Sequence, residues 1–578
     1  MKKVILSACL LAFLSVLFAQ NRNEVLFSVG NDKVTVSEFI GTFTKNNSLS
    51  NATESELRDY LNLFINFKLK VRDGLDTQID TLLPFKKELA SYKSQSAQSY
   101  LVDKEVTDKL MQEAIERSKE MVRASHILLM CEPDVSPKDS LAVFNKIMDI
   151  RKRIMAKEFT FPEAAVLYSE DPSAHDEVGL RGMKQFGNKG DLGYFHAFDL
   201  IYPFESAAYI TPVGTISMPV RSRFGYHIIW VQDKQPAISK IDIGQILLID
   251  SAAQFGRISP AVMEKLALIE NAIKEGEDFE ELAAQYTEDP SSKKNNGKVD
   301  PFMPNRRPGD FVKVCLSLEK NQISEPFSSI VGWHIVKLHN LEVPELKPED
   351  QKYALSTKIQ RDTRSNLSVE SFLEKLKKEY RFSEKGKDAM FKLLLKNLSD
   401  KKTLPTETEL LALPGVSKLK PVAIFANQTI TPQDFIKYLG RFFDVNLKQS
   451  VITFLEMHYQ NFIKENIITY EFENLENKYP EFQELMNEYK YGMILFEMNN
   501  EKVWSEALKD TLGLENFYEE MKFNYLDITE NPKPLSEVRS IVLTDFQNKL
   551  EDAWLSLLRE RYQVWINEEL FNSLLKNK

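Results

Sequence analysis

Two histidines and an aspartate are the residues of this sequence whose positions suggest chemistry. His126 lies in the stretch VRASHILL, residues 122–129, where the alternation of side chains is typical of a strand. This alternation places His126 on the same face as apolar residues, a position that needs a physical reason. His227 lies in another apolar stretch, GYHIIWV, and Asp171 precedes a proline in the turn-like SEDPS.

Other interpretations compete with a functional site. A histidine on a core strand is more often a packing residue with hydrogen-bonded ring nitrogens, and Asp171 could belong to a turn that ends a helix. Two histidines and an aspartate can also form a facial metal triad. The further polar groups that a metal needs are not evident, however, and the HExxH spacing is absent. We therefore predict neither a metal nor another cofactor.

The composition limits the classes of partner. The chain has 578 residues, enough for several domains, with 43% hydrophobic and 27% charged residues, as in a globular protein. A formal net charge of −10 without a long basic tract argues against nucleic acid. Cys131 and Cys315 lie in apolar contexts, which favours buried thiols over a disulfide.

The N-terminus has the pattern of a secretory signal peptide. Lys2 and Lys3 precede an apolar run at 4–18, and we expect residues 1–19 to be removed. A lipoprotein box ending at Cys9 is the alternative, but it would leave few apolar residues before the cut. No other segment has the 18 or more apolar residues of a membrane helix. We expect an exported chain without stable membrane insertion.

A tandem repeat organises the middle of the chain. The offset between the copies shrinks after the acidic turn, which a single insertion in the first copy, about DEVGLRGMKQF, explains. The matching pairs are RASHILL (123–129) with DIGQILL (242–248), YSEDPSA (168–174) with YTEDPSS (286–292), and GYHIIWV (225–231) with GWHIVKL (332–338).

Each copy reads as strand, long helix, short helix, strand, helix, strand, strand. Strands that lack a helical crossover between every pair indicate a small mixed or antiparallel sheet surrounded by helices, an α+β fold. The flanks are mainly helical. A hairpin at 25–36 precedes a helix capped by Thr53 and Glu56, and residues 422–439 repeat this theme. We predict segments 20–121, 122–235, 236–341 and 342–578.

Five motifs of the first copy, in this order, resemble the parvulin-type (PpiC-like) peptidyl-prolyl isomerases. They are SHILL (125–129), SEDPSA (169–174), KGDLGYF (189–195), YPFESAAY (202–209) and FGYHII (224–229). The whole layout resembles the SurA class of periplasmic chaperones, although here the C-terminal helical part is longer. The resemblance implies a periplasmic isomerase and chaperone whose partners are unfolded or extended proline-containing chains, in particular outer-membrane proteins.

The resemblance also assigns roles. Rotation about an X–Pro bond requires no nucleophile, only an apolar slot for the ring and a dry polar surround. The implied catalytic residues are His126, Asp171 and His227, the histidines as a buried hydrogen-bonded pair. The implied substrate-binding residues are Leu192, Phe195, Leu200, Phe204, Ser222 and Phe224. Phe224 departs from the family pattern, since some members have serine there.

The second copy departs further. Gln245 replaces His126, and GKVDPF at 297–302 puts Val299 in place of Leu192 and introduces Pro301, while His334 and Asp289 are kept. We expect this copy to be weak or silent in catalysis and still able to bind peptide. In the alternative hypothesis, both copies are peptide clamps without useful catalysis. Chaperone surfaces are expected in the aromatic flanks, for example YKYGMILFEM at 489–498.

Overall fold

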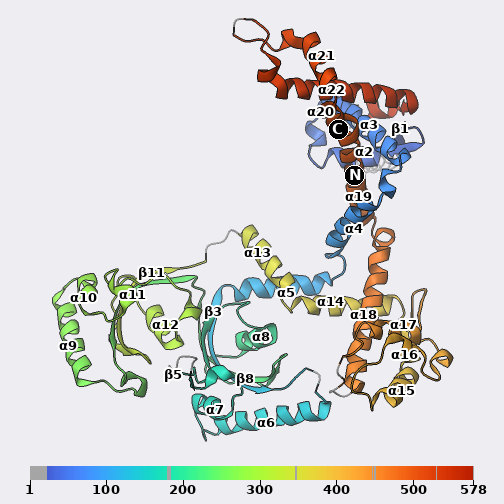
Figure 1. Ribbon diagram of the computed structural model, residues 1–578. Coiled ribbons are helices and arrows are strands. Elements are labelled where there is room, and N and C mark those ends of the chain that lie inside the picture. Colours follow the sequence, from blue (N-terminus) through green and yellow to red (C-terminus); the bar gives the residue numbers. More distant parts are fainter. Residues whose placement is uncertain are drawn as a thin grey trace, which may run out of the picture. The chain divides into compact units, whose positions relative to one another are not determined.

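The computed structural model describes residues 23–576 except 134, 179–183, 345–347, 446, 448–450 and 529. The chain forms two compact units (Figure 1). The first joins residues up to Tyr100 with those from Phe472 onward, and the second spans Leu101–Glu471. The expected flanking segments 20–121 and 342–578 are thus each divided between the units. The expected signal peptide and Cys9 lie outside the described residues.

The first repeat has the predicted α+β fold. Its four strands form an antiparallel sheet in the order β6-β3-β8-β7. The elements are β3 (Glu120–Met130), α6 (Pro137–Met155), α7 (Phe161–Tyr168), β6 (Asp191–Phe195), α8 (Tyr202–Ile210), β7 (Val220–Arg221) and β8 (Gly225–Pro236). The predicted insertion contributes a short hairpin, β4 (Glu177–Val178) with β5 (Lys184–Gln185).

The two faces of this sheet bury two separate cores, because successive strand residues point to opposite sides. On one face, Ile127 and Leu129 of β3 pack against α6 and α7. On the other face, Val122 and Ala124 pack against α8, through a cluster that includes Phe204. Figure 1 shows α6 and α7 on the side of the sheet away from α8. His126 belongs to the α8 face by register.

The second repeat builds a smaller antiparallel sheet, β10-β11-β9. Its elements are β9 (Lys240–Ile249), α9 (Pro260–Glu275), α10 (Phe279–Tyr286), α11 (Pro290–Lys293), α12 (Gly309–Leu316), β10 (Phe327–Ser328) and β11 (Gly332–Glu342). Where the first repeat has β6, the second has only isolated bridges, from Ile241 to Phe302 and from Gly244 to Lys298. Pro301 has no backbone N–H that could donate a hydrogen bond to the neighbouring strand, which accounts for the shortened pairing.

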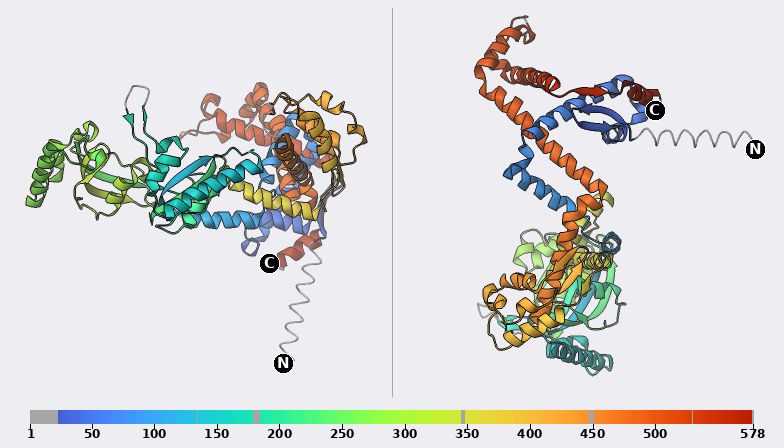
Figure 2. Two further views of the ribbon diagram at one scale, coloured as in Figure 1. Left: turned by 90° about the horizontal axis from the view of Figure 1, so that it is seen from below. Right: turned by 90° about the vertical axis from the view of Figure 1, so that its right-hand side faces the viewer.

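The flanks combine helices with small sheets. In the first unit, β1 (Val25–Val29) pairs with β2 (Asp32–Thr35) as predicted and also with β15 (Val564–Ile566) from the C-terminal end (Figure 2). Its main helices are α3 (Glu54–Asp76), with the predicted capping box, α4 (Leu83–Ala97), α19 (Pro480–Asn499) and α22 (Leu535–Arg561).

Several helices and a hairpin of the second unit that matter for the site or for the comparison with the sequence lie outside the repeats. They are α5 (Lys104–Arg117), α13 (Pro348–Arg361), α14 (Ser365–Glu379), and α17 (Pro432–Gly440), which follows the predicted hairpin of β13 (Ala423–Phe425) and β14 (Gln428–Ile430). In the described part of the chain, no helix is long and apolar enough to span a bilayer. Cys131 and Cys315 are buried free thiols, as expected.

Gly225 is required where β8 begins beside the end of β3. Its backbone has φ +150°, and an added Cβ would lie 2.0 Å from the carbonyl oxygen of Leu129. We predict that Gly225→Ala lowers the free energy of unfolding by roughly 1–3 kcal/mol, because backbone atoms must move apart. Gly41→Ala is the control, since nothing lies within 4 Å of its Cβ position. Equal denaturation midpoints for the two variants would contradict the prediction.

Candidate active site

The two histidines meet on the α8 face of the first sheet. In the register of β3 and β8, His126 pairs with Ile229 and His227 with Leu128, so the two side chains lie diagonally on one face. Their rings are nearly parallel, with planes 15° apart, and their Nδ1 atoms are 3.4 Å apart. His126 is 5% exposed and His227 4%. The predicted pair is therefore present and buried.

Polar groups occupy both outer ends of this pair. His126 Nε2 lies 2.9 Å from Asp171 Oδ2, and His227 Nε2 lies 2.7 Å from Ser222 Oγ. One assignment of protons lets Ser222 donate to His227 and His227 donate through Nδ1 to His126, while His126 Nε2 meets Asp171 Oδ2 in a close polar contact outside the geometry of a regular hydrogen bond. The result is a chain of polar contacts that joins Ser222 to Asp171.

The electrostatics keep His227 neutral. Burial, and next the charge effect of His126, lower the pKa of His227 to about 4 against the effect of Asp171. The close polar contact with His126 lowers the pKa of Asp171 far below its usual range, helped by the backbone N–H of Ser173. Asp171 is thus an ionised acceptor at neutral pH. Asp171 also caps the 3-10 turn Pro172–Ala174. It therefore belongs both to a turn and to the candidate site.

Aromatic and aliphatic side chains cover the pair. The ring of Phe204 on α8 stands edge-on to both histidines at 5.5 Å, and Phe195 on β6 packs against it at 6.3 Å. Leu192 and Leu200 are half-buried against the same cluster. The four apolar residues named from the sequence therefore gather above the polar chain.

Phe224 lies at the rim of this site. Its side chain is 48% exposed, and its backbone N–H donates to Ser222 Oγ at 3.0 Å. Phe224 thus supports the polar chain through its backbone, so the last partner of His227 is Ser222, and no serine is needed at position 224.

The second repeat keeps the polar contacts at both outer ends of this chain but lacks the central hydrogen bond between the two strands. Gln245 Nε2 donates to Asp289 Oδ2 at 2.9 Å, and His334 Nε2 lies 2.8 Å from Ser329 Oγ. Gln245 Oε1 and His334 Nδ1 are buried without a hydrogen-bond partner among the described residues. The glutamine keeps the contact with the aspartate, while the link between the two strands is not made.

Sequence comparison of the copies also overlooked Arg307. It stands four residues before Phe311, as Leu200 stands before Phe204. Its guanidinium lies 5.4 Å from the ring centre of Phe302 and 5.8 Å from that of Phe311. With burial, it lowers the pKa of His334 to about 4. A cation therefore covers the aromatic slot of the second repeat.

Comparison with known proteins agrees with this geometry. A rotamase family model, the PPIC-type PPIASE domain, matches residues 126–233 and 248–340. Both repeats therefore match the parvulin-type domain model over most of their length. We call them parvulin domain 1 and parvulin domain 2.

Several curated proteins named Chaperone SurA resemble the chain. That of Pseudomonas fluorescens is 27% identical over 33% of this chain and 45% of its own length. That of Hydrogenovibrio crunogenus is 26% identical over 57% and 69%, and that of Pseudomonas aeruginosa 32% identical over 26% and 36%. The similarity thus spans less than half of two of these three relatives.

The ring nitrogens of the histidine pair are directed to protein groups. Nowhere in the described ranges do three or more His, Cys, Asp or Glu side chains gather as they would around an ion. In parvulin domain 1, the two Nδ1 atoms face one another, and both Nε2 atoms are directed to Ser222 and Asp171. The ring nitrogens are therefore engaged within the chain of polar contacts.

The lowered pKa of His227 predicts a pH dependence of stability. Because the unfolded histidine titrates near 6.5 and the folded one near 4, the unfolded state binds more protons between these values. The contribution of His227 to the free energy of unfolding is fully present above pH 6.5 and falls by roughly 3 kcal/mol as the pH drops to 4. Urea unfolding across this range measures the slope.

His227→Gln is the control, because glutamine preserves a donor and an acceptor without titrating. The slope should decrease in this variant and keep the part due to His334, whose pKa is also about 4. Identical slopes for wild type and variant would show that His227 does not contribute.

Proposed function

We propose that the protein is an exported peptidyl-prolyl cis-trans isomerase and chaperone, with catalysis in parvulin domain 1. The observation that carries this proposal is the chain Ser222–His227–His126–Asp171, buried beneath Phe204. A chain of this polarity supplies a rigid polar floor under an apolar wall. No nucleophile is involved, because no bond is broken.

The site is suited to stabilising a twisted amide. The planar X–Pro amide carries more negative charge on its oxygen than the twisted one, and rotation costs about 18–20 kcal/mol. An ionised Asp171 close to the substrate carbonyl disfavours the planar form, while the apolar wall holds the proline ring and excludes water. The neutral histidines hold Asp171 and the floor in place. This is differential stabilisation of the transition state.

We predict that Phe204→Ala lowers kcat/KM at least tenfold, which corresponds to about 1.4 kcal/mol of transition-state stabilisation. The proline slot loses the ring that contacts both histidines. Phe311→Ala is the matched control, since Phe311 holds the same position in parvulin domain 2 and is equally buried. A protease-free assay on a proline peptide, with folding checked by circular dichroism, gives the comparison.

If Phe204→Ala and Phe311→Ala lowered activity equally, the assignment to domain 1 would be wrong. If the wild type showed no rate above background while still binding peptide, the clamp hypothesis would replace catalysis.

We propose that parvulin domain 2 binds peptide without catalysis. Its floor is interrupted between Gln245 and His334, whereas Phe302 and Phe311 retain the aromatic wall. Arg307 over these rings makes the slot suitable for a peptide that places a carbonyl or carboxylate beside the guanidinium.

Chaperone activity is proposed for the first unit, where a groove of about 660 Å³ lies between α4 and α19. Tyr92 and Tyr489 stack at 4.8 Å along it, and Phe496 is 58% exposed. The groove also contains Glu88, Glu488 and Glu497, of which Glu488 pairs with Lys45. We propose an extended client segment with apolar and basic side chains as its occupant. Unfolded outer-membrane proteins in the periplasm are the proposed clients.

Replacing Phe496 and Met493 together by serine should weaken the suppression of client aggregation several-fold, because the apolar contact area of the groove is lost. Isomerase activity should not change. Phe523→Ser is the control, being 69% exposed and outside the groove. Light scattering of an unfolded outer-membrane protein measures the effect, and equal suppression by both variants would place the client site elsewhere.

A further inference from the structure

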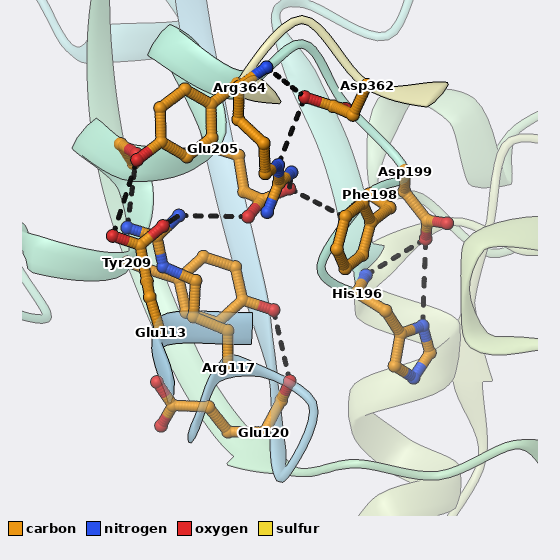
Figure 3. A network of polar contacts seen from close by, with 12 residues as sticks. Glu113, Arg117, Glu120, His196, Phe198, Asp199, Glu205, Tyr209, Asp362 and Arg364 are labelled. Carbon is orange, nitrogen blue, oxygen red and sulfur yellow. Dashed lines mark hydrogen bonds and ion pairs between the residues drawn. The ribbon is translucent and has the colours of Figure 1, made fainter. Parts of the chain in front are cut away.

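A buried ionic cluster lies directly behind the apolar wall of parvulin domain 1. Glu205, the residue after Phe204, has no exposed surface. Its Oε1 lies 2.9 Å from Arg117 Nη1 of α5, and its Oε2 lies 2.8 Å from Arg364 Nη2 at the start of α14. Figure 3 shows Glu205 between the two arginines. Both arginines lie outside the domain matched by the family model.

Such a cluster is costly unless every charge is paired. Arg364 is fully buried and also pairs with Asp362 at 3.0 Å, and Arg117 pairs with Glu113 at 2.8 Å. Burial lowers the pKa of Arg364, but its contacts with Glu205 and Asp362 together raise it more, so the guanidinium stays charged. The three elements α5, α8 and α14 are thus tied through one carboxylate.

The same carboxylate holds the loop that carries Leu200. Glu205 Oε2 accepts the backbone N–H of Phe198 at 2.6 Å. Phe198 has φ +73°, a left-handed conformation that is unfavourable for a residue with a Cβ. The Arg364 guanidinium lies 3.8 Å from the centre of the Phe198 ring. These two contacts offset the cost of the strained backbone.

The other side of this loop contacts parvulin domain 2. His196 Nε2 lies 3.0 Å from the carbonyl oxygen of Ile238, and Asn305 donates to Asp199 at 3.2 Å. Phe198 and Tyr202 pack against a small core formed by α5 and α13. The segment from His196 to Phe204 is therefore held by elements on both sides, and it supplies half of the apolar wall.

We infer that Glu205 is a positioning residue: with Arg117 and Arg364 it holds the Leu200–Phe204 wall, so that helices outside parvulin domain 1 set its isomerase activity. This inference rests on the proposed isomerase function. It makes the flanking helices part of the enzyme, because a shift of α5 or α14 would alter the proline slot.

The test uses the full chain. Arg364→Met should lower kcat/KM at least tenfold and raise KM, because the wall is no longer held; a smaller folded fraction would lower kcat and leave KM unchanged. Amide exchange in peptides covering residues 196–204 should become faster. Lys70→Met is the control, since it removes another buried cation, whose partner Glu551 also belongs to the first unit. Its activity should equal that of the wild type.

Two further variants separate positioning from stability. Phe198→Ala leaves all charges of the cluster paired and should still lower kcat/KM. This variant therefore tests the positioning role even if Arg364→Met fails to fold. Glu205→Gln combined with Arg364→Met removes opposite charges together, so thermal stability should partly return while activity stays low.

Activity that recovered with stability, or wild-type KM in both Arg364→Met and Phe198→Ala, would overturn the inference. If the wild type lacked isomerase activity, the proposed function would fail, and unchanged exchange at 196–204 would then refute the positioning role separately.

Discussion

The contact between two buried imidazoles imposes conditions on the surrounding structure. Two Nδ1 atoms at 3.4 Å form a hydrogen bond only if one donates and the other accepts, so the accepting ring must be neutral. The outer ring nitrogens then face Asp171 at one end and Ser222 at the other. The contact also requires adjacent strands in one register and an apolar cover that keeps water out. The sheet order, the Asp171 turn and the position of α8 all satisfy these conditions.

Parvulin domain 2 shows how the chain depends on its central link. Gln245 has the donor that Asp289 needs and an acceptor that His334 could use, yet only the first contact is made. Hydrogen bonds to Ser291 and Ser292 outweigh burial and hold the pKa of Asp289 at about 2, so the acidic end is preserved. The aromatic wall is preserved too, now beneath Arg307. The two domains share their fold and differ in the polar floor, where the functions proposed for them diverge.

Local sequence was sufficient for much of this. The period of two around His126, the capping box at Thr53 and the hairpin at Gly30 depend on neighbouring residues, and the repeat revealed the site by comparing one chain with itself. The pairing of β15 with β1 and the link from Arg364 to Glu205 join residues far apart in sequence. Neither contact could be predicted from a periodic pattern or a motif spacing in the sequence. Arg364 lies among ordinary helical polar residues, and only the fold shows that it is fully buried.

Because of the cluster at Glu205, the folding unit extends beyond the ends of the sequence repeat. Residues 122–235 contain Glu205 but neither Arg117 nor Arg364. Excised alone, this segment would lose both cations together with the helices that carry them, so the loop with Leu200 would lose its ionic support. The unit that holds the proposed site together therefore extends from α5 to α14, with parvulin domain 2 inserted between these helices in the sequence.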